Sequence, residues 1–150
     1  MDNGKKNRQA ETRLAAQLMK RILVHFRGQI DDALRPQGVT TAQLQVLYAI
    51  RNEPGASGAQ LARLCYVTPQ SAQSLLKGLE EGGWIVRVKD KVNDRILVAQ
   101  LTQSGEELLE TAEKAARVIE KRVWKGVSDD AVEALNGVLQ QCLGNLESES

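Results

Sequence analysis

The hydrophobic positions of the chain repeat with the period of an α-helix over most of its length. Over residues 14–34 they recur every four residues and form a single stripe, which predicts a long helix that ends at Pro36 and Gly38. The last third of the chain repeats the pattern over residues 108–123 and 132–146. We therefore expect long amphipathic helices at both ends of the chain.

Three shorter helices are expected in the middle, each introduced by an N-capping residue. Thr40 and Ser57 each precede a glutamine by three residues, the spacing of a capping box, and Thr68 precedes Pro69, a favoured first residue of a helix. The pair Gly82-Gly83 ends the third helix. The positions predicted to be buried are Leu44, Leu47 and Ile50 on the first helix, Leu61, Ala62, Leu64 and Cys65 on the second, and Ala72, Leu75, Leu76 and Leu79 on the third.

β-Branched residues then cluster on both sides of a polar turn. Residues 84–88 and 96–101 are predicted to form two strands joined by KDKVND, which contains an Asn-Asp turn signal. A hairpin of two strands is too weak to stand alone, so it must pack on the helices. This order of elements predicts a winged helix-turn-helix, a mainly α fold with a small β-hairpin and long helices at both ends.

The third of the short helices carries a polar face that suits the reading of DNA. Gln70, Gln73, Ser74 and Lys77, which we call the recognition face, lie on one side of this helix, opposite its apolar side. Amides and hydroxyls donate to and accept from base edges in the major groove, and a lysine reaches guanine or a phosphate. Any amphipathic surface helix also shows a polar face, so this pattern is not decisive alone.

The turn between the strands adds positive charge beside this helix. Arg87, Lys89, Lys91 and Arg95, which we call the cationic wing, are accompanied by only two aspartates. Narrow minor grooves attract arginine, so Arg95 near the tip is expected to enter one. A charged loop is often only a solvated loop, and the salt dependence of DNA binding separates the two interpretations. The residues expected to contact DNA are Ser57, Thr68, Gln70, Ser71, Gln73, Ser74, Lys77, Arg87, Lys89, Lys91 and Arg95.

Three segments carry a resemblance to a known family. VTTAQLQVLYAI, GAQLARLCYVTPQSAQSLLKGLEEGGWIVR and NDRILVAQLTQSGEELL resemble the MarR (multiple antibiotic resistance regulator) family of bacterial transcription factors. In that family this region holds a Gly-hydrophobic-Val-x-Arg start, an Asp-x-Arg wing and a closing Leu-Thr-x-x-Gly. These patterns fall here on residues 83–87, 93–95 and 101–105. The resemblance covers the chain from about Thr40 to Leu109.

One wing residue departs from the family pattern. Asn93 stands where the family usually has an aspartate that holds the wing arginine. An amide in place of a carboxylate removes a charge-assisted hydrogen bond to Arg95, unless the neighbouring Asp94 substitutes for it.

The resemblance implies a homodimeric transcriptional regulator, more commonly a repressor, that binds a pseudo-palindromic operator. It implies an N-terminal dimerisation helix in residues 1–35, a DNA-binding domain in residues 36–102 and C-terminal dimerisation helices in residues 103–150. The apolar stripes support this independently, because a small winged domain cannot cover them, although helices that fold back on their own chain could. The residues expected at the dimer interface are Leu14, Leu18, Val132, Leu135, Leu139 and Leu143.

The resemblance also implies regulation by a small molecule or by oxidation. Family members commonly release DNA when a phenolic or aromatic carboxylate binds between the dimer helices and the DNA-binding lobe, or when a cysteine oxidises. His25 lies on the first helix near such a cleft, although a lone histidine on a helix is more often packed or solvated. Oxidation of Cys65 would shift the recognition helix, yet family thiol sensors usually place their cysteine near the first helix, which has none.

Composition and charge change the picture only in part. The net charge of +1 divides into +4 over residues 1–35, +2 over residues 36–100 and −5 over residues 101–150, so the cations lie where DNA binding is expected. No apolar run approaches the length of a membrane span, which is about 18 residues. No secretory signal is expected either, so the cytoplasm is the default location. Cys65 and Cys142 lack metal-ligand or disulfide spacing and are expected to be buried, with no metal or cofactor.

Two other classes of function compete with DNA binding. Catalysis is not expected, because the sequence lacks paired carboxylates beside a nucleophile and a phosphate-binding glycine loop, and it has one histidine. A winged-helix protein-interaction or scaffold dimer without specific DNA binding remains the alternative, since the recognition face carries little charge. A protein-binding module would more often make that face apolar.

Overall fold

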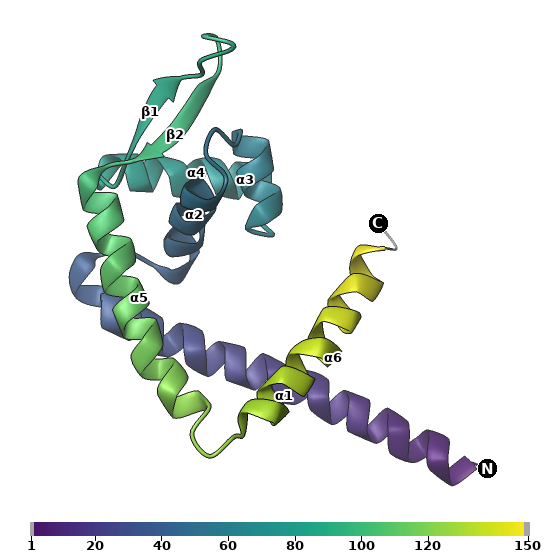
Figure 1. Ribbon diagram of the computed structural model, residues 1–150. Helices are drawn as coiled ribbons and strands as arrows, with labels where there is room; N and C mark the ends of the chain where they lie inside the picture. The colour runs from purple at the N-terminus through teal and green to yellow at the C-terminus, as the bar shows by residue number, and fades with distance from the viewer. Residues whose placement is uncertain (1, 149–150) are drawn as a thin grey trace. The chain divides into compact units, whose positions relative to one another are not determined.

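The computed structural model describes residues 2–148, with side chains from residue 4 onward. The sequence predicted every α-helix and both strands, and most ends differ by one or two residues, but α1 begins at Asp2, twelve residues before the predicted stripe, and the 3₁₀ turn η1 was not predicted. The elements are α1 (Asp2–Leu34), the 3₁₀ turn η1 (Arg35–Gln37), α2 (Thr41–Asn52), α3 (Gly58–Leu64), α4 (Pro69–Glu81), β1 (Ile85–Lys89), β2 (Leu97–Leu101), α5 (Gln103–Val123) and α6 (Asp129–Glu147) (Figure 1). Contacts divide the chain within α5 into a unit up to Arg117 and a unit from Val118 on.

The predicted N-caps begin the three short helices. Thr40 and Ser57 each form a complete capping box, in which the hydroxyl accepts from the backbone N–H three residues on and that glutamine accepts in return. The Thr68 hydroxyl accepts from the backbone N–H of Ser71 at 3.1 Å, and Pro69 occupies the first position of α4. These caps satisfy N–H groups that have no partner within the helix, so the sequence alone fixes where each helix begins.

The core of the first unit lies where α2, α3 and α4 meet the hairpin and the start of α5. Leu47 and Leu79 are completely buried, and Leu61, Ile85 and Leu109 nearly so. Figure 1 shows α2, α3 and α4 clustered at the base of the hairpin. The apolar side of α4 is therefore packed against the core, and its polar side is uncovered.

Several predicted core positions are wrong. Leu64 is 48% exposed, and Cys65 and Leu75 are only half-buried. The helix α3 has seven residues, so it turns Leu61 and Ala62 inward but cannot bury a third and fourth apolar side chain at its end. Cys142 on α6 is exposed rather than buried.

The hairpin is tied to α5 by a close approach of two backbones. Strands β1 and β2 pair antiparallel, with Ile85 opposite Leu101 and Lys89 opposite Leu97. The Thr102 N–H donates to the Trp84 carbonyl at 3.1 Å, and the Thr102 hydroxyl caps α5 by accepting from the Gly105 N–H. Thr102 therefore caps α5 and also joins it to the start of the hairpin.

The two terminal stripes remain largely uncovered in the single chain. On α1, Ile30 and Leu34 are buried, whereas Leu14 and Leu18 are 48% and 43% exposed. On α6, Val132 is half-buried and Leu135, Leu139 and Leu143 are exposed. None of the described helices combines the length and apolarity that a bilayer crossing requires.

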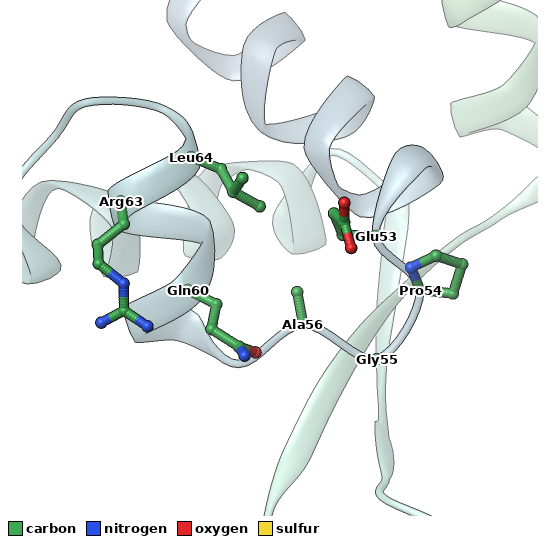
Figure 2. A pocket seen from close by; sticks show the side chains of 7 residues that line it. All are labelled: Glu53, Pro54, Gly55, Ala56, Gln60, Arg63 and Leu64. Carbon is green, nitrogen blue, oxygen red and sulfur yellow. The ribbon is translucent and has the colours of Figure 1, made fainter. Parts of the chain in front are cut away.

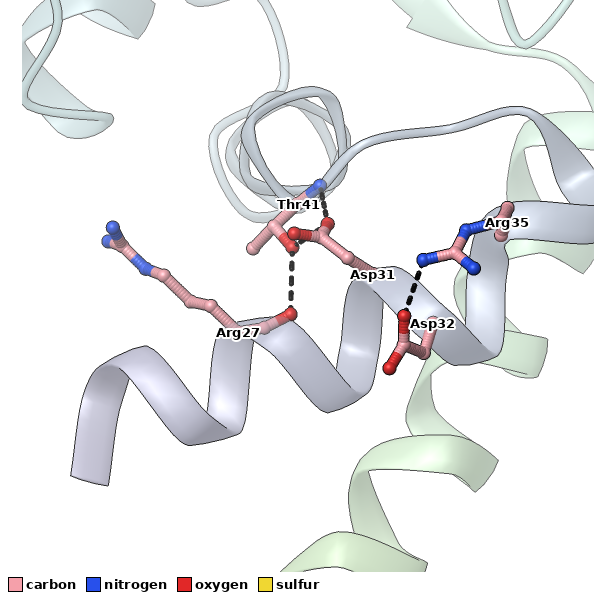
Figure 3. A network of polar contacts seen from close by, with 5 residues as sticks. All are labelled: Arg27, Asp31, Asp32, Arg35 and Thr41. Carbon is pink, nitrogen blue, oxygen red and sulfur yellow. Dashed lines mark hydrogen bonds and ion pairs between the residues drawn. The ribbon is translucent and has the colours of Figure 1, made fainter. Parts of the chain in front are cut away.

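The helix α1 is joined to the winged region by a polar contact as well as by packing. Asp31 on α1 accepts hydrogen bonds from the backbone N–H and the hydroxyl of Thr41, the first residue of α2 (Figure 3). The Thr41 hydroxyl also lies 3.5 Å from the Arg27 carbonyl oxygen. This carboxylate therefore fixes the start of α2 relative to α1, at the boundary between the two predicted domains.

Candidate nucleic-acid interface

The start of α4 is organised by a pair of hydroxyls. Besides capping the helix, the Thr68 hydroxyl donates to the Ser71 hydroxyl at 2.9 Å. The two side chains therefore bond to each other and order the first turn of α4. The free N–H groups of that turn carry the positive end of the helix dipole. Such a helix start binds a phosphate oxygen well.

Three members of the recognition face extend freely from α4. Gln70, Ser74 and Lys77 are exposed, on the side opposite the buried Ala72, Leu76 and Leu79. Lys77 lies 3.9 Å from Glu81, but both side chains are well exposed, so this pair holds the lysine only weakly. The amide, hydroxyl and ammonium groups at these positions can each meet a base edge or a phosphate.

The fourth member, Gln73, contacts residues of two neighbouring elements. Its Oε1 accepts from the Arg87 Nη1 on β1 at 3.5 Å. Its Nε2 lies against the start of α3, only 2.6 Å from the place that a Cβ on Gly58 would occupy. Gln73 is therefore exposed like the other three, but its amide oxygen is bonded to β1 and its amide nitrogen lies beside the first residue of α3.

Arg87 differs from the other cations of the cationic wing. Its side chain is 22% exposed, and its Nε is buried without a hydrogen-bond partner, with the nearest Glu80 oxygen at 4.0 Å. Lys89, Lys91 and Arg95, in contrast, are exposed. The sequence grouped the four by charge alone, and the structure separates one at the base of the hairpin from three along it.

The turn of the wing is built by Asp90, a residue that sequence reasoning did not select. Its carboxylate accepts from the backbone N–H of Val92 at 3.3 Å and of Asn93 at 3.1 Å. Asn93 in turn accepts from the backbone N–H of Arg95 at 3.1 Å. Asn93 thus orders the backbone at Arg95 while the side chain of Arg95 stays exposed. An aspartate at the start of the polar turn KDKVND was the signal that could have identified the anchor.

Open hollows border the winged region, and three of them are lined by described residues. The first, about 460 Å³, lies between the α2–α3 loop and α3, with Gln60 and Arg63 on one side and Glu53 and Pro54 on the other (Figure 2). The Gln60 side chain is already bonded within the capping box of Ser57. The charged residues at this hollow are Glu53 and Arg63. The second, about 400 Å³, lies between α2 and the turn after α3, beside Tyr48, Cys65 and Tyr66.

Burial changes the acidity of two groups at the second hollow. Desolvation raises the pKa of Tyr48, and the nearby Glu113 carboxylate adds to the increase, while Arg51, 5.0 Å from the ring centre, opposes it. Desolvation also raises the pKa of the Cys65 thiol. A raised pKa lowers the thiolate fraction, so Cys65 is a poor candidate for a reactive cysteine.

The third hollow, about 510 Å³, lies where α1 meets the start of α2. It is bordered by Arg27, Asp31 and Arg35 from the end of α1 and by Thr40 and Thr41. Arg35 pairs with Asp32 at 2.5 Å on the surface. His25 is exposed on α1, two residues before Arg27, and does not border this hollow. Within the described part of the chain, no cluster of His, Cys, Asp and Glu suits a metal ion.

The sequence is similar to known proteins over most of the chain. The sequence pattern of the MarR family matches residues 37–96. The HTH-type transcriptional repressor Rv2887 of Mycobacterium tuberculosis is 35% identical over 106 residues, which are 71% of this chain and 76% of the relative.

Solved structures extend the similarity to the whole fold. The structure of Rv2887 in complex with salicylic acid is 30% identical, has a TM-score of 0.65 and aligns 83% of this chain with 93% of that one. CouR from Rhodococcus jostii RHA1, bound to p-coumaroyl-CoA, is 25% identical with a TM-score of 0.73, over 83% of this chain and 88% of that one.

A third structure, the MarR family transcription regulator SP03579, covers 97% of this chain and 98% of its own, with a TM-score of 0.82 at 20% identity, and so supports the fold alone. These relatives are regulators of transcription rather than enzymes. The chain, a winged helix-turn-helix protein with an uncovered recognition helix beside a cationic hairpin, belongs to the MarR family of DNA-binding transcriptional regulators.

Proposed function

We propose that the protein is a sequence-specific repressor that binds a pseudo-palindromic operator as a homodimer in the cytoplasm. The observation that carries this proposal is the exposure of Gln70, Ser74 and Lys77 on a helix buttressed from behind, beside the exposed Lys89, Lys91 and Arg95. The first group offers base-edge contacts and the second offers contacts with phosphates and the minor groove.

Dimerisation is supported by the uncovered leucines at both ends of the chain. Residues 1–35 and 103–150 serve as dimerisation helices in this proposal, and residues 36–102 serve as the DNA-binding domain. Leu14, Leu18, Leu139 and Leu143 are each more than a third exposed, an apolar surface that a monomer rarely leaves in water. Two-fold symmetry then requires half-sites about 34 Å apart along the DNA.

The hollow bordered by Arg27 and Arg35 is the proposed site of a small aromatic carboxylate. Arg35 already pairs with Asp32, and Asp31 also borders the hollow, so Arg27 is the guanidinium that would bind the ligand's carboxylate. The structures of relatives contain salicylic acid and p-coumaroyl-CoA. The hollow lies at the α1–α2 junction, so a ligand there would act on the contact between Asp31 and Thr41. By linkage, such a ligand releases DNA only if it prefers the conformation that binds DNA poorly.

Selection from a randomised duplex pool tests the function directly. The full-length protein would be used at about 150 mM salt, where non-specific phosphate binding is already weak. Enrichment of a palindrome with half-sites one helical turn apart is expected. No enrichment, with or without salicylate, would contradict the proposal and bring forward a winged-helix scaffold that binds protein instead.

A further inference from the structure

We propose that Arg87 sets the base preference of the recognition helix without touching DNA, by holding the Gln73 amide in one orientation. This inference rests on the proposed sequence-specific DNA binding. Arg87 is a positioning residue in this view, and Gln73 is the residue that meets the base. The clamp joins β1, α4 and the start of α3, so it connects the wing to the recognition helix.

The position of the guanidinium favours an internal role over a phosphate contact. Arg87 is the least exposed cation of the cationic wing, at 22%, and its Nε is buried. An arginine that neutralises a phosphate keeps its donors in water until DNA arrives, as Lys89, Lys91 and Arg95 do. The two acceptors near Arg87 are instead Gln73 at 3.5 Å and Glu80 at 4.0 Å, both on α4.

Gly58 supplies the other wall of the clamp. A Cβ at this position would lie 2.6 Å from the Gln73 Nε2, so any larger residue there displaces the amide. Gly58 is the first residue of α3 and has nothing else within 4 Å of that point apart from the Gln73 Cδ at 3.9 Å. An alanine would favour the helix at this position, and the space that the glycine leaves is occupied by Gln73.

The clamp determines which hydrogen bonds Gln73 offers. A glutamine reads adenine by accepting from N6 through Oε1 and donating to N7 through Nε2, which requires both groups in a fixed order. The hydrogen bond from Arg87 to Oε1, with Nε2 beside Gly58, favours one order of the two amide groups over the opposite one. A side chain held in place before binding also loses less rotamer freedom when it meets the base.

The test uses the operator enriched by the wild-type protein, with Arg87→Ala, Gln73→Ala and the double variant. Both single variants should lose affinity about fivefold to tenfold and relax preference at the same base pair, and the double variant should be no worse than either. The slope of log affinity against log salt should stay unchanged in Arg87→Ala. A slope reduced by about one with base preference intact would show a phosphate contact and overturn the inference.

Gly58→Ala tests the same clamp without removing a charge. It should relax preference at that base pair in the wild-type background and change nothing further in the Gln73→Ala background. Because it does not depend on Arg87, it also decides the case if Arg87→Ala fails to fold. Additive effects of Gly58→Ala and Gln73→Ala would overturn the clamp. A wild-type protein that enriches no operator would overturn the proposed function and this inference together, whereas an enriched operator with indifferent variants overturns the inference alone.

Discussion

The carboxylate of Asp31 on α1 accepts hydrogen bonds from the backbone N–H of Thr41, at 2.8 Å, and from the Thr41 hydroxyl at the start of α2. One side chain thus caps a helix that lies ten residues further along the chain. Through it, α1, which carries the proposed dimer surface, holds the first helix of the winged region in place.

Replacing Asp31 by alanine should therefore lower the stability of the protein. Loss of a capping carboxylate costs about 1 kcal/mol, and urea unfolding followed by circular dichroism would measure it. Asp32→Ala is the matched control, because Asp32 pairs with Arg35 on the surface, where both side chains are largely exposed. Equal losses in the two variants would contradict a specific role of Asp31.

Gly105→Ala should destabilise the protein although alanine is the better helix former. A Cβ on Gly105 would lie 2.2 Å from the carbonyl oxygen of Trp84, and because that atom belongs to the backbone, α5 and the start of β1 must separate. A cost of roughly 1–3 kcal/mol is expected. Gly137→Ala is the opposite case, since nothing lies within 4 Å of its added methyl group, and it should stabilise α6 by about 1 kcal/mol.

Arg95→Ala should weaken operator binding through the wing. Arg95 is exposed on a turn whose backbone Asp90 and Asn93 hold, so its removal changes a contact with DNA and leaves the turn intact. Affinity should fall on the order of tenfold, and the salt slope should decrease by about one if the guanidinium meets phosphate. Lys125→Ala, the same charge change outside the winged domain, should leave both unchanged. Similar losses in both variants would indicate that only net charge matters.

Leu139→Asp should convert the proposed dimer into a monomer. Leu139 belongs to the exposed apolar stripe of α6, and a carboxylate in a buried interface carries a large desolvation cost. Sedimentation velocity at micromolar concentration would show the change. Gln141→Asp, on the other side of α6, should remain a dimer. A wild-type chain that sediments as a monomer would refute the dimeric mechanism.

Cys65 should react slowly with iodoacetamide in the native protein. Desolvation raises the pKa of its thiol, so the thiolate fraction at pH 8 is lower than that of an exposed cysteine and rises as the pH approaches the raised pKa. The Cys142→Ser variant makes Cys65 the single thiol, and the same variant in concentrated urea provides the reference rate. Faster alkylation in the native state than in urea would restore Cys65 as a redox candidate. For the same reason, treatment of the protein with peroxide should not abolish DNA binding.

The sequence by itself determined the elements and their order. Thr40, Ser57 and Thr68 begin their helices as predicted, because a cap depends on neighbours three residues away and needs no tertiary contact. The period of the apolar residues likewise gave the faces of the long helices. The order of elements then indicated the winged helix-turn-helix, which the relatives and the family pattern confirm.

Only the tertiary structure decided what each polar side chain does. Periodicity put Gln73 beside Gln70 and charge put Arg87 beside Arg95, yet the structure joins Gln73 to Arg87 by a hydrogen bond and half-buries Arg87, while Arg95 stays in solvent. It also revealed Asp31, Asp90 and Gly58 as residues that hold the site. Their partners lie on other elements or in backbone groups whose positions depend on how the helices and the hairpin pack, and local sequence patterns contain no information about those distances.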